Sequence, residues 1–210
     1  MQCKSPDTRI YGELTSLNAG LLRILVWQDG PDAPGAPRLA PTIAIQLRQL
    51  TRDELAFIAG TPALLAGFVP PAEANRADGV ADSGMPGNHY VPSAQSAITA
   101  GAPRLPGDSW LRLTRVFTAA LLTWLWKSDQ HDELFRALCL GYGEKLPPFS
   151  VRLIESLATD AAPRLCVRFA GHPRFWPDLV VAARSEDPQL RALSRLSVIP
   201  LVLAEDRASQ

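Results

Sequence analysis

The sequence lacks a hydrophobic run long enough to cross a bilayer. Its longest apolar stretch, residues 116–126, is interrupted by Thr118 and Thr123 and falls short of the about 20 apolar residues that a membrane-spanning helix needs. The first residues also lack a basic segment followed by an apolar one, which is the pattern of a secretory signal. We therefore expect a cytoplasmic protein with no membrane partner.

The chain also has few cysteines and no formal net charge. The three cysteines, Cys3, Cys139 and Cys166, are odd in number and lack metal-ligand spacing, which argues against a disulfide framework and favours a reducing compartment. Lysine plus arginine and aspartate plus glutamate balance at 21 each, so the basic excess typical of nucleic-acid-binding proteins is absent. Any DNA contact must therefore come from a local patch or from a basic partner.

The motifs of common enzymes are absent as well. The three histidines, His89, His131 and His172, are scattered, and none lies beside a serine, cysteine or carboxylate in a nucleophile arrangement. No phosphate-binding loop or dinucleotide fingerprint occurs. Two acidic residues follow His131, but consecutive residues on a helix point in different directions and do not converge on a metal. We predict no catalysis, no cofactor and no metal site.

Helical periodicity, in contrast, is plentiful. Apolar residues recur at three- and four-residue spacing in residues 10–27 and again in residues 109–126, the pattern of a buried helix face. Thr51 and Glu54 form a capping box that begins a helix, and Gly60 ends it. Further helices are expected at 42–50, 129–140, 150–159, 176–184 and from 188 onward, where Leu190, Leu193 and Leu196 share one face, with a short strand at 165–169. The predicted fold class is mainly α.

A segment of biased composition divides the chain. Residues 70–107 are rich in proline, glycine, alanine, asparagine and serine and hold few large apolar groups, so burial cannot offset the entropy lost on ordering them. Structureless insertions of this length are uncommon within one compact domain. The predicted organisation is a helical unit at 1–69, a linker at 70–107, a second helical unit at 108–204 and a frayed tail at 205–210.

The two helical units resemble each other in sequence. Matching residues recur roughly 100 positions later in the same order of helix, loop, helix and apolar tail. The matches are Ala19, Leu21, Leu22, Leu25 and Asp29 with Ala119, Leu121, Leu122, Leu125 and Asp129, then Ile58-Ala59 with Leu157-Ala158, then Leu64, Leu65 and Phe68 with Leu165, Cys166 and Phe169. We interpret them as tandem units that pack as a pseudo-dimer. The alternative is a chance likeness between two amphipathic hairpins.

Two groups of side chains are candidates for binding macromolecules. Trp124 and Trp126 lie on different faces of one helix, so a buried Trp124 would leave Trp126 facing a partner. The predicted partner interface comprises Trp126, Trp110, Phe175 and Trp176. Arginines in the second unit can clasp phosphates bidentately, the alternative being a solubilising surface with internal ion pairs. The candidate DNA contacts are Arg164, Arg168, Arg174, Arg184, Arg191 and Arg195.

The second unit resembles the flagellar transcriptional activator FlhD family. The likeness lies in Phe135-Arg136 and Leu140-Gly141, in Leu157-Ala158, and in the run containing Leu165, Cys166, Arg168 and Phe169. The first unit repeats this order with Leu50-Thr51, Ile58-Ala59, Leu64-Leu65 and Phe68. Family members are shorter, single-copy chains, and the asparagine expected before the cysteine segment is replaced by Thr61-Pro62 and Asp160-Ala161.

The resemblance implies a bacterial transcription factor subunit that acts on promoter DNA together with a partner subunit. Such a partner would supply the phosphate contacts that a neutral chain lacks. Leu65 stands where the family's cysteine falls in the first unit, so no bridge between the units is expected there. The alternative class is a non-enzymatic scaffold or accessory subunit of a secretion or conjugation apparatus. Either function is compatible with an oligomer.

Overall fold

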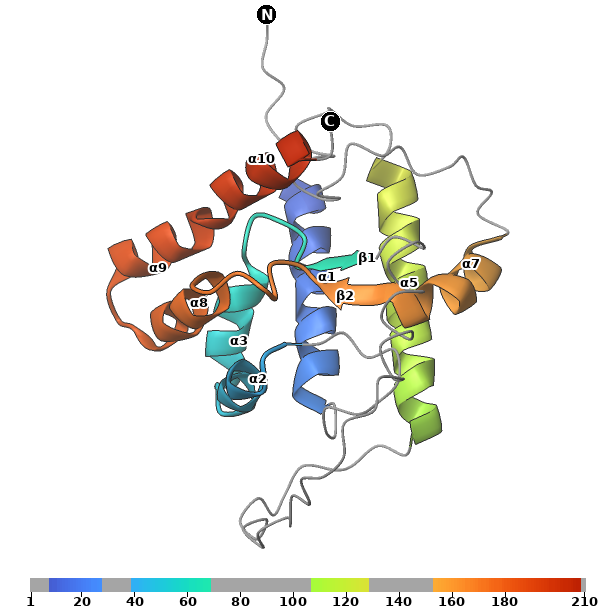
Figure 1. The fold of residues 1–210 in the computed structure, drawn as a ribbon, viewed down its shortest axis with the longest axis horizontal. Coiled ribbons are helices and arrows are strands. Elements are labelled where there is room, and N and C mark those ends of the chain that lie inside the picture. The colour runs from blue at the N-terminus through green and yellow to red at the C-terminus, as the bar shows by residue number, and fades with distance from the viewer. Residues whose placement is uncertain (1–7, 28–38, 69–106, 129–152, 209–210) are drawn as a thin grey trace, which may run out of the picture.

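The computed structural model describes residues 8–27, 39–68, 107–128 and 153–208. In these residues the protein is mainly helical with one small two-stranded sheet, which confirms the predicted fold class (Figure 1). The predicted helix at 129–140 and the predicted linker, apart from Gly107, lie outside the described residues. His89 and His131 also lie outside them.

Two long helices pack side by side at the centre of the fold. Helix α1 (Thr8–Trp27) and helix α5 (Gly107–Ser128) run in opposite directions (Figure 1). A Cβ atom on Gly20 would lie 3.1 Å from the Phe117 ring, so the missing side chain lets the two helices approach closely. The buried residues that face inward are Leu14, Leu17, Leu21, Leu22, Ile24 and Leu25 on α1, and Phe117, Leu121, Leu122, Trp124 and Leu125 on α5.

Helices α2 (Pro41–Arg48) and α3 (Arg52–Ala59) pack against α1. The Thr51 hydroxyl accepts a hydrogen bond from the backbone N–H of Glu54, and the Glu54 carboxylate accepts one from the backbone N–H of Thr51 at 2.6 Å. The predicted capping box is therefore confirmed. The same backbone bond from Thr51 lowers the pKa of Glu54. Helix α3 ends at Gly60, as predicted.

A small antiparallel sheet joins the two predicted units. Strand β1 (Ala66–Phe68) pairs with strand β2 (Leu165–Val167), and Gly67 lies opposite Cys166. The sequence predicts a strand at 165–169, and β2 confirms it for residues 165–167, whereas Arg168 and Phe169 lie in a turn. Strand β1 is a new finding, because the sequence predicts only an apolar tail at that position.

Helix α7 (Ile154–Ala161) packs on α5. Leu122 of α5 forms a small hydrophobic cluster there with Ile154 and Ala158. A short 3-10 helix, η2 (Ala162–Arg164), then leads directly into β2. The predicted helix at 150–159 is found in part: the described helix begins at Ile154 and extends two residues further, to Ala161.

The last three helices cross over to the first predicted unit. Helix α8 (Phe175–Arg184) packs on α2 and α3, and helix α9 (Pro188–Leu196) packs on α8 and leads to helix α10 (Val198–Ala208) (Figure 1). One hydrophobic core extends through both units and includes Leu21, Leu65, Leu121, Leu179 and Val202. The two predicted units therefore share a core instead of folding as separate domains.

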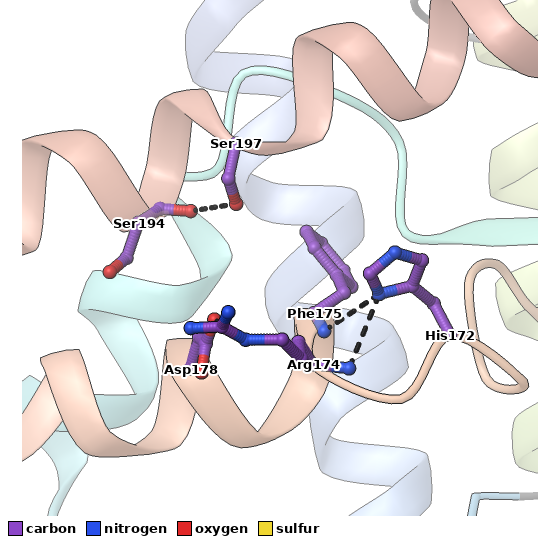
Figure 2. Close-up of polar contacts among 6 residues, drawn as sticks. All are labelled: His172, Arg174, Phe175, Asp178, Ser194 and Ser197. Atoms are coloured by element: carbon purple, nitrogen blue, oxygen red, sulfur yellow. Dashed lines mark hydrogen bonds and ion pairs between the residues drawn. The ribbon is translucent and has the colours of Figure 1, made fainter.

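The C-terminal helix is broken at Ser197, whereas the sequence predicts one continuous helix. Pro200 has no N–H to donate to the carbonyl of Leu196, so the helix cannot continue regularly through this turn. The hydroxyl of Ser197 donates instead to the carbonyl of Ser194 at 2.7 Å (Figure 2). Helix α10 continues to Ala208, so most of the tail predicted to fray is helical.

Candidate interaction surfaces

The predicted aromatic interface is largely internal. Phe175 and Trp176 are only 2 % and 1 % exposed, so these two residues belong to the core and not to a partner interface. The Trp176 indole N–H donates to the carbonyl of Arg168 at 3.0 Å, and the Phe175 ring stacks edge to face on its neighbour. Trp126 is 40 % exposed and does lie at the surface, whereas the side chain of Trp110 is outside the described part of the chain.

Arg168 is also a core residue and not a DNA contact. Its side chain is 5 % exposed. One guanidinium nitrogen, Nη1, donates to the carbonyl of Leu64 at 3.0 Å, and the group lies 4.8 Å from the centre of the Phe169 ring. The Arg168 side chain therefore links the residue that follows β2 to the segment that precedes β1.

Arg191 and Arg195 lie together on the inner side of α9. Their guanidinium groups stack over Phe57 of α3, at 4.5 and 5.7 Å from the ring centre. Arg195 also donates to the carbonyl of Gly60, which ends α3. Burial, together with the charge of Arg191, lowers the pKa of Arg195. Both predicted DNA contacts are therefore engaged in holding α9 on α3.

The other three candidate arginines do not form one basic face. Arg164 is half-buried in η2. Arg174 and Arg184 lie at the two ends of α8, about 15 Å apart along the helix axis. The Nε atom of Arg174 is 3.4 Å from the Asp178 carboxylate (Figure 2), and Arg184 lies 3.5 Å from the amide oxygen of Gln49. The six candidate arginines thus do not form one contiguous phosphate-binding surface.

His172 caps helix α8. Its Nδ1 atom accepts hydrogen bonds from the backbone N–H groups of Arg174 and Phe175, at 3.3 and 3.0 Å (Figure 2). These are donors of the first helical turn, which no helical carbonyl can satisfy. Sequence reasoning missed this structural role, because histidine is not among the common capping residues.

Asn18 is a second polar residue that sequence reasoning missed. It is fully buried on α1, and its amide nitrogen donates to the carbonyls of Ala59 and Ala63 at 3.1 and 3.0 Å, and to that of Thr61 at 3.3 Å. Its amide oxygen accepts from the backbone N–H of Leu65 at 3.0 Å. The side chain thereby fixes the loop from α3 to β1. The detectable signal was an asparagine within a leucine-rich helix face.

The outer face of α9 and α10 is apolar. Leu190, Leu193, Leu196, Ile199 and Leu203 are all exposed, with Leu193 at 67 % and Leu196 at 50 %. We call these five residues the leucine face. The remaining exposed residues between 188 and 204 are uncharged. The sequence places the leucines on one helix face, but such a face usually packs on the core; here it faces outward.

A shallow groove of about 770 Å³ lies between α1 and α5. Small residues make up much of its α1 side, and Glu13 and Lys127 lie at one end. Its lining residues are Gly12, Glu13, Ser16, Leu17, Gly20, Phe117, Ala120, Thr123, Trp124 and Lys127. The groove brings together no group of acids, bases or nucleophiles from which a reaction can be assigned.

Comparisons with protein-family models, with curated proteins and with solved structures find no match for this chain. The likeness to the FlhD family therefore depends on the residues quoted for it. Within the described ranges, no helix has the length and apolarity to cross a membrane. The same ranges contain no group of three or more histidine, cysteine or acidic side chains able to hold a metal ion.

Proposed function

We propose that this chain is a transcriptional regulator subunit built from two FlhD-like units, and that it acts on promoter DNA through a partner subunit. The observation that carries the proposal is the reciprocal placement of corresponding elements. Helix α1 lies antiparallel to α5, and strand β1 lies antiparallel to β2 (Figure 1). Two identical subunits related by a twofold axis make contacts of this kind.

The strand register fits the same relationship only if the alignment of the two strands is shifted. In a twofold arrangement every contact occurs twice with its partners exchanged. If Gly67 corresponds to Cys166, the pairs Ala66 with Val167 and Phe68 with Leu165 are one contact repeated. The sequence alignment instead placed Leu65 at the cysteine position, two residues earlier. Glycine at position 67 supplies no thiol, so the expected absence of a bridge between the units is unchanged.

The central helices support the proposal at the level of packing. Leu21 and Leu121 are matching residues of α1 and α5, and both are fully buried. Asn18 and Thr118, which occupy matching positions, are also fully buried although polar. A buried polar residue at matching positions is compatible with a common origin of the two helices.

The arginines explain why the proposed DNA contact requires a partner. Arg168, Arg191 and Arg195 are occupied by contacts inside the protein. The chain has no net charge, so nonspecific attraction to the phosphate backbone is weak. A partner with a basic surface would then hold the DNA, and this chain would contribute protein contacts.

Chromatin immunoprecipitation of the tagged chain in its host, followed by gel-shift assays, tests the proposal. We expect enrichment at promoters, no retention of those fragments by the purified chain alone, and retention once the co-purified partner is added. Arg174→Ala should leave this retention unchanged, because the partner makes the phosphate contacts. The proposal fails if no promoter is enriched in the host.

A scaffold or accessory subunit of a secretion or conjugation apparatus is the second candidate. The leucine face favours it, because an exposed apolar surface suits protein docking equally well without DNA. Co-purification with proteins of such an apparatus, together with the absence of promoter enrichment, would favour this function over transcriptional regulation.

A further inference from the structure

Helix α9 packs with its polar face toward α3. Arg191 and Arg195 stack on Phe57 beneath it, and Ser194 is the residue that the helix buries. An amphipathic surface helix normally buries its apolar stripe. The reversed orientation leaves the leucine face in contact with water in a single copy of the chain, and this face continues onto α10.

The spacing of the leucine face is self-complementary. Counted from Leu196, the exposed apolar side chains lie three residues to either side, at Leu193 and Ile199, and then six and seven residues away, at Leu190 and Leu203. An antiparallel copy of this segment, centred on Leu196, would place Leu193 opposite Ile199 and Leu196 opposite its own copy, with Leu190 one residue out of step with Leu203. A reciprocal contact of Leu193 with Ile199 would be the signature of a twofold interface.

We propose that the leucine face is a homodimer interface in which α9 and α10 of two copies pack antiparallel about Leu196. The exposed residues from 188 to 204 carry no charge, so this stretch of two identical faces meets without like-charge repulsion. The face comprises only five exposed apolar side chains, and small interfaces are typical of weak complexes. We therefore expect a reversible dimer in the micromolar range that added salt does not weaken.

Sedimentation of the full chain over a wide concentration range tests the interface with charge-swapped variants. Leu193→Lys and Ile199→Glu should each weaken dimerisation by more than about tenfold, because each places an unpaired charge against an apolar side chain. An equimolar mixture of the two variants should recover the dimer, since the lysine of one chain then faces the glutamate of the other. Val116→Lys is the matched control: Val116 is 62 % exposed on α5, and this variant should dimerise like the parent.

Cysteine cross-linking tests the register independently. Leu196→Cys should give a covalent dimer under mild oxidation beyond any that the parent forms, because the two copies of this residue meet at the axis. Leu190→Cys should not, because its two copies lie about 18 Å apart along the helices. Circular dichroism checks that the variants remain helical.

Three outcomes would overturn the interface. The first is a parent chain that stays monomeric at several hundred micromolar. The second is a dimer that Leu193→Lys leaves intact. The third is a monomer in which Leu193→Lys abolishes binding of a different protein, which would assign the leucine face to that partner. None of these outcomes affects the promoter experiment, so the dimer and the proposed function fail independently.

Discussion

Replacing Asn18 by leucine tests how one buried amide organises the fold. The two side chains branch alike at Cγ and have the same number of heavy atoms, and leucine favours the α-helix more than asparagine does, so α1 itself should be preserved. What is lost is the donor to the carbonyls of Ala59, Thr61 and Ala63 and the acceptor for the N–H of Leu65. These backbone groups lie in the buried loop that leads from α3 to β1.

The expected loss of stability follows from the number of groups left without a partner. Three of the four hydrogen bonds of Asn18 are 3.1 Å or shorter, and the fourth is 3.3 Å. Each buried polar group left unsatisfied costs about 1–3 kcal/mol. Counting three full bonds and allowing the loop to relax, we expect a loss of about 3–5 kcal/mol, a large part of the roughly 5–15 kcal/mol that stabilises a typical domain.

Urea unfolding followed by circular dichroism measures this loss. With a slope of about 2 kcal/mol per molar urea, the midpoint should fall by roughly 2 M. Thr118→Val is the matched control, because the Thr118 hydroxyl is buried and has no hydrogen-bond partner among the described residues; its removal should change stability by less than about 0.5 kcal/mol or raise it. A loss below about 1 kcal/mol for Asn18→Leu, or an equal loss in both variants, would refute the reasoning.

Three further changes probe other contacts of the fold. Thr51→Ala removes one arm of the capping box and should lower the free energy of unfolding by about 1 kcal/mol, read from the urea midpoint. Gly60→Ala brings a Cβ to 2.7 Å from Nη2 of Arg195; a double-mutant cycle with Arg195→Ala should show a coupling of about 1 kcal/mol, and zero coupling would contradict the contact. Gly67→Cys places a Cβ 3.4 Å from Sγ of Cys166, so oxidation should form a disulfide between the two strands. A thiol titration should then find two fewer thiols than in the reduced variant; an unchanged number would contradict the strand register.

The parts of the fold that were predictable are those decided by local sequence. The leucine spacing of α1, the capping box at Thr51 and the stop at Gly60 act within one or two turns of a helix. Strand β2 was predictable because Leu165–Val167 and its neighbours are rich in apolar and branched side chains. The second strand was not, because Ala66, Gly67 and Phe68 pair only with a segment about 100 residues away.

The candidate interaction residues were less predictable, because side-chain direction depends on the tertiary packing. The sequence suggested Trp176 as an interface residue and Arg168 as a DNA contact, but only the packing of α8 shows that the indole of one donates to the carbonyl of the other inside the core. Sequence also grouped Leu190, Leu193 and Leu196 correctly on one face. The sequence could not show that Arg191 and Arg195, on the opposite face of α9, pack on Phe57 in place of the leucines.

The orientation of α9 therefore bears on two questions about this protein, whether it binds DNA directly and whether it binds another protein. Half a turn of rotation would bury the leucines and present Arg191 and Arg195 to phosphates. Leaving three leucines half-exposed forgoes roughly 2–4 kcal/mol of burial. Against this loss, two arginine contacts with Phe57 and one charged hydrogen bond to Gly60 together contribute about 3–5 kcal/mol of stabilisation. The terms nearly cancel in one chain, so covering the leucine face by a second protein surface stabilises the observed orientation and keeps both arginines away from DNA.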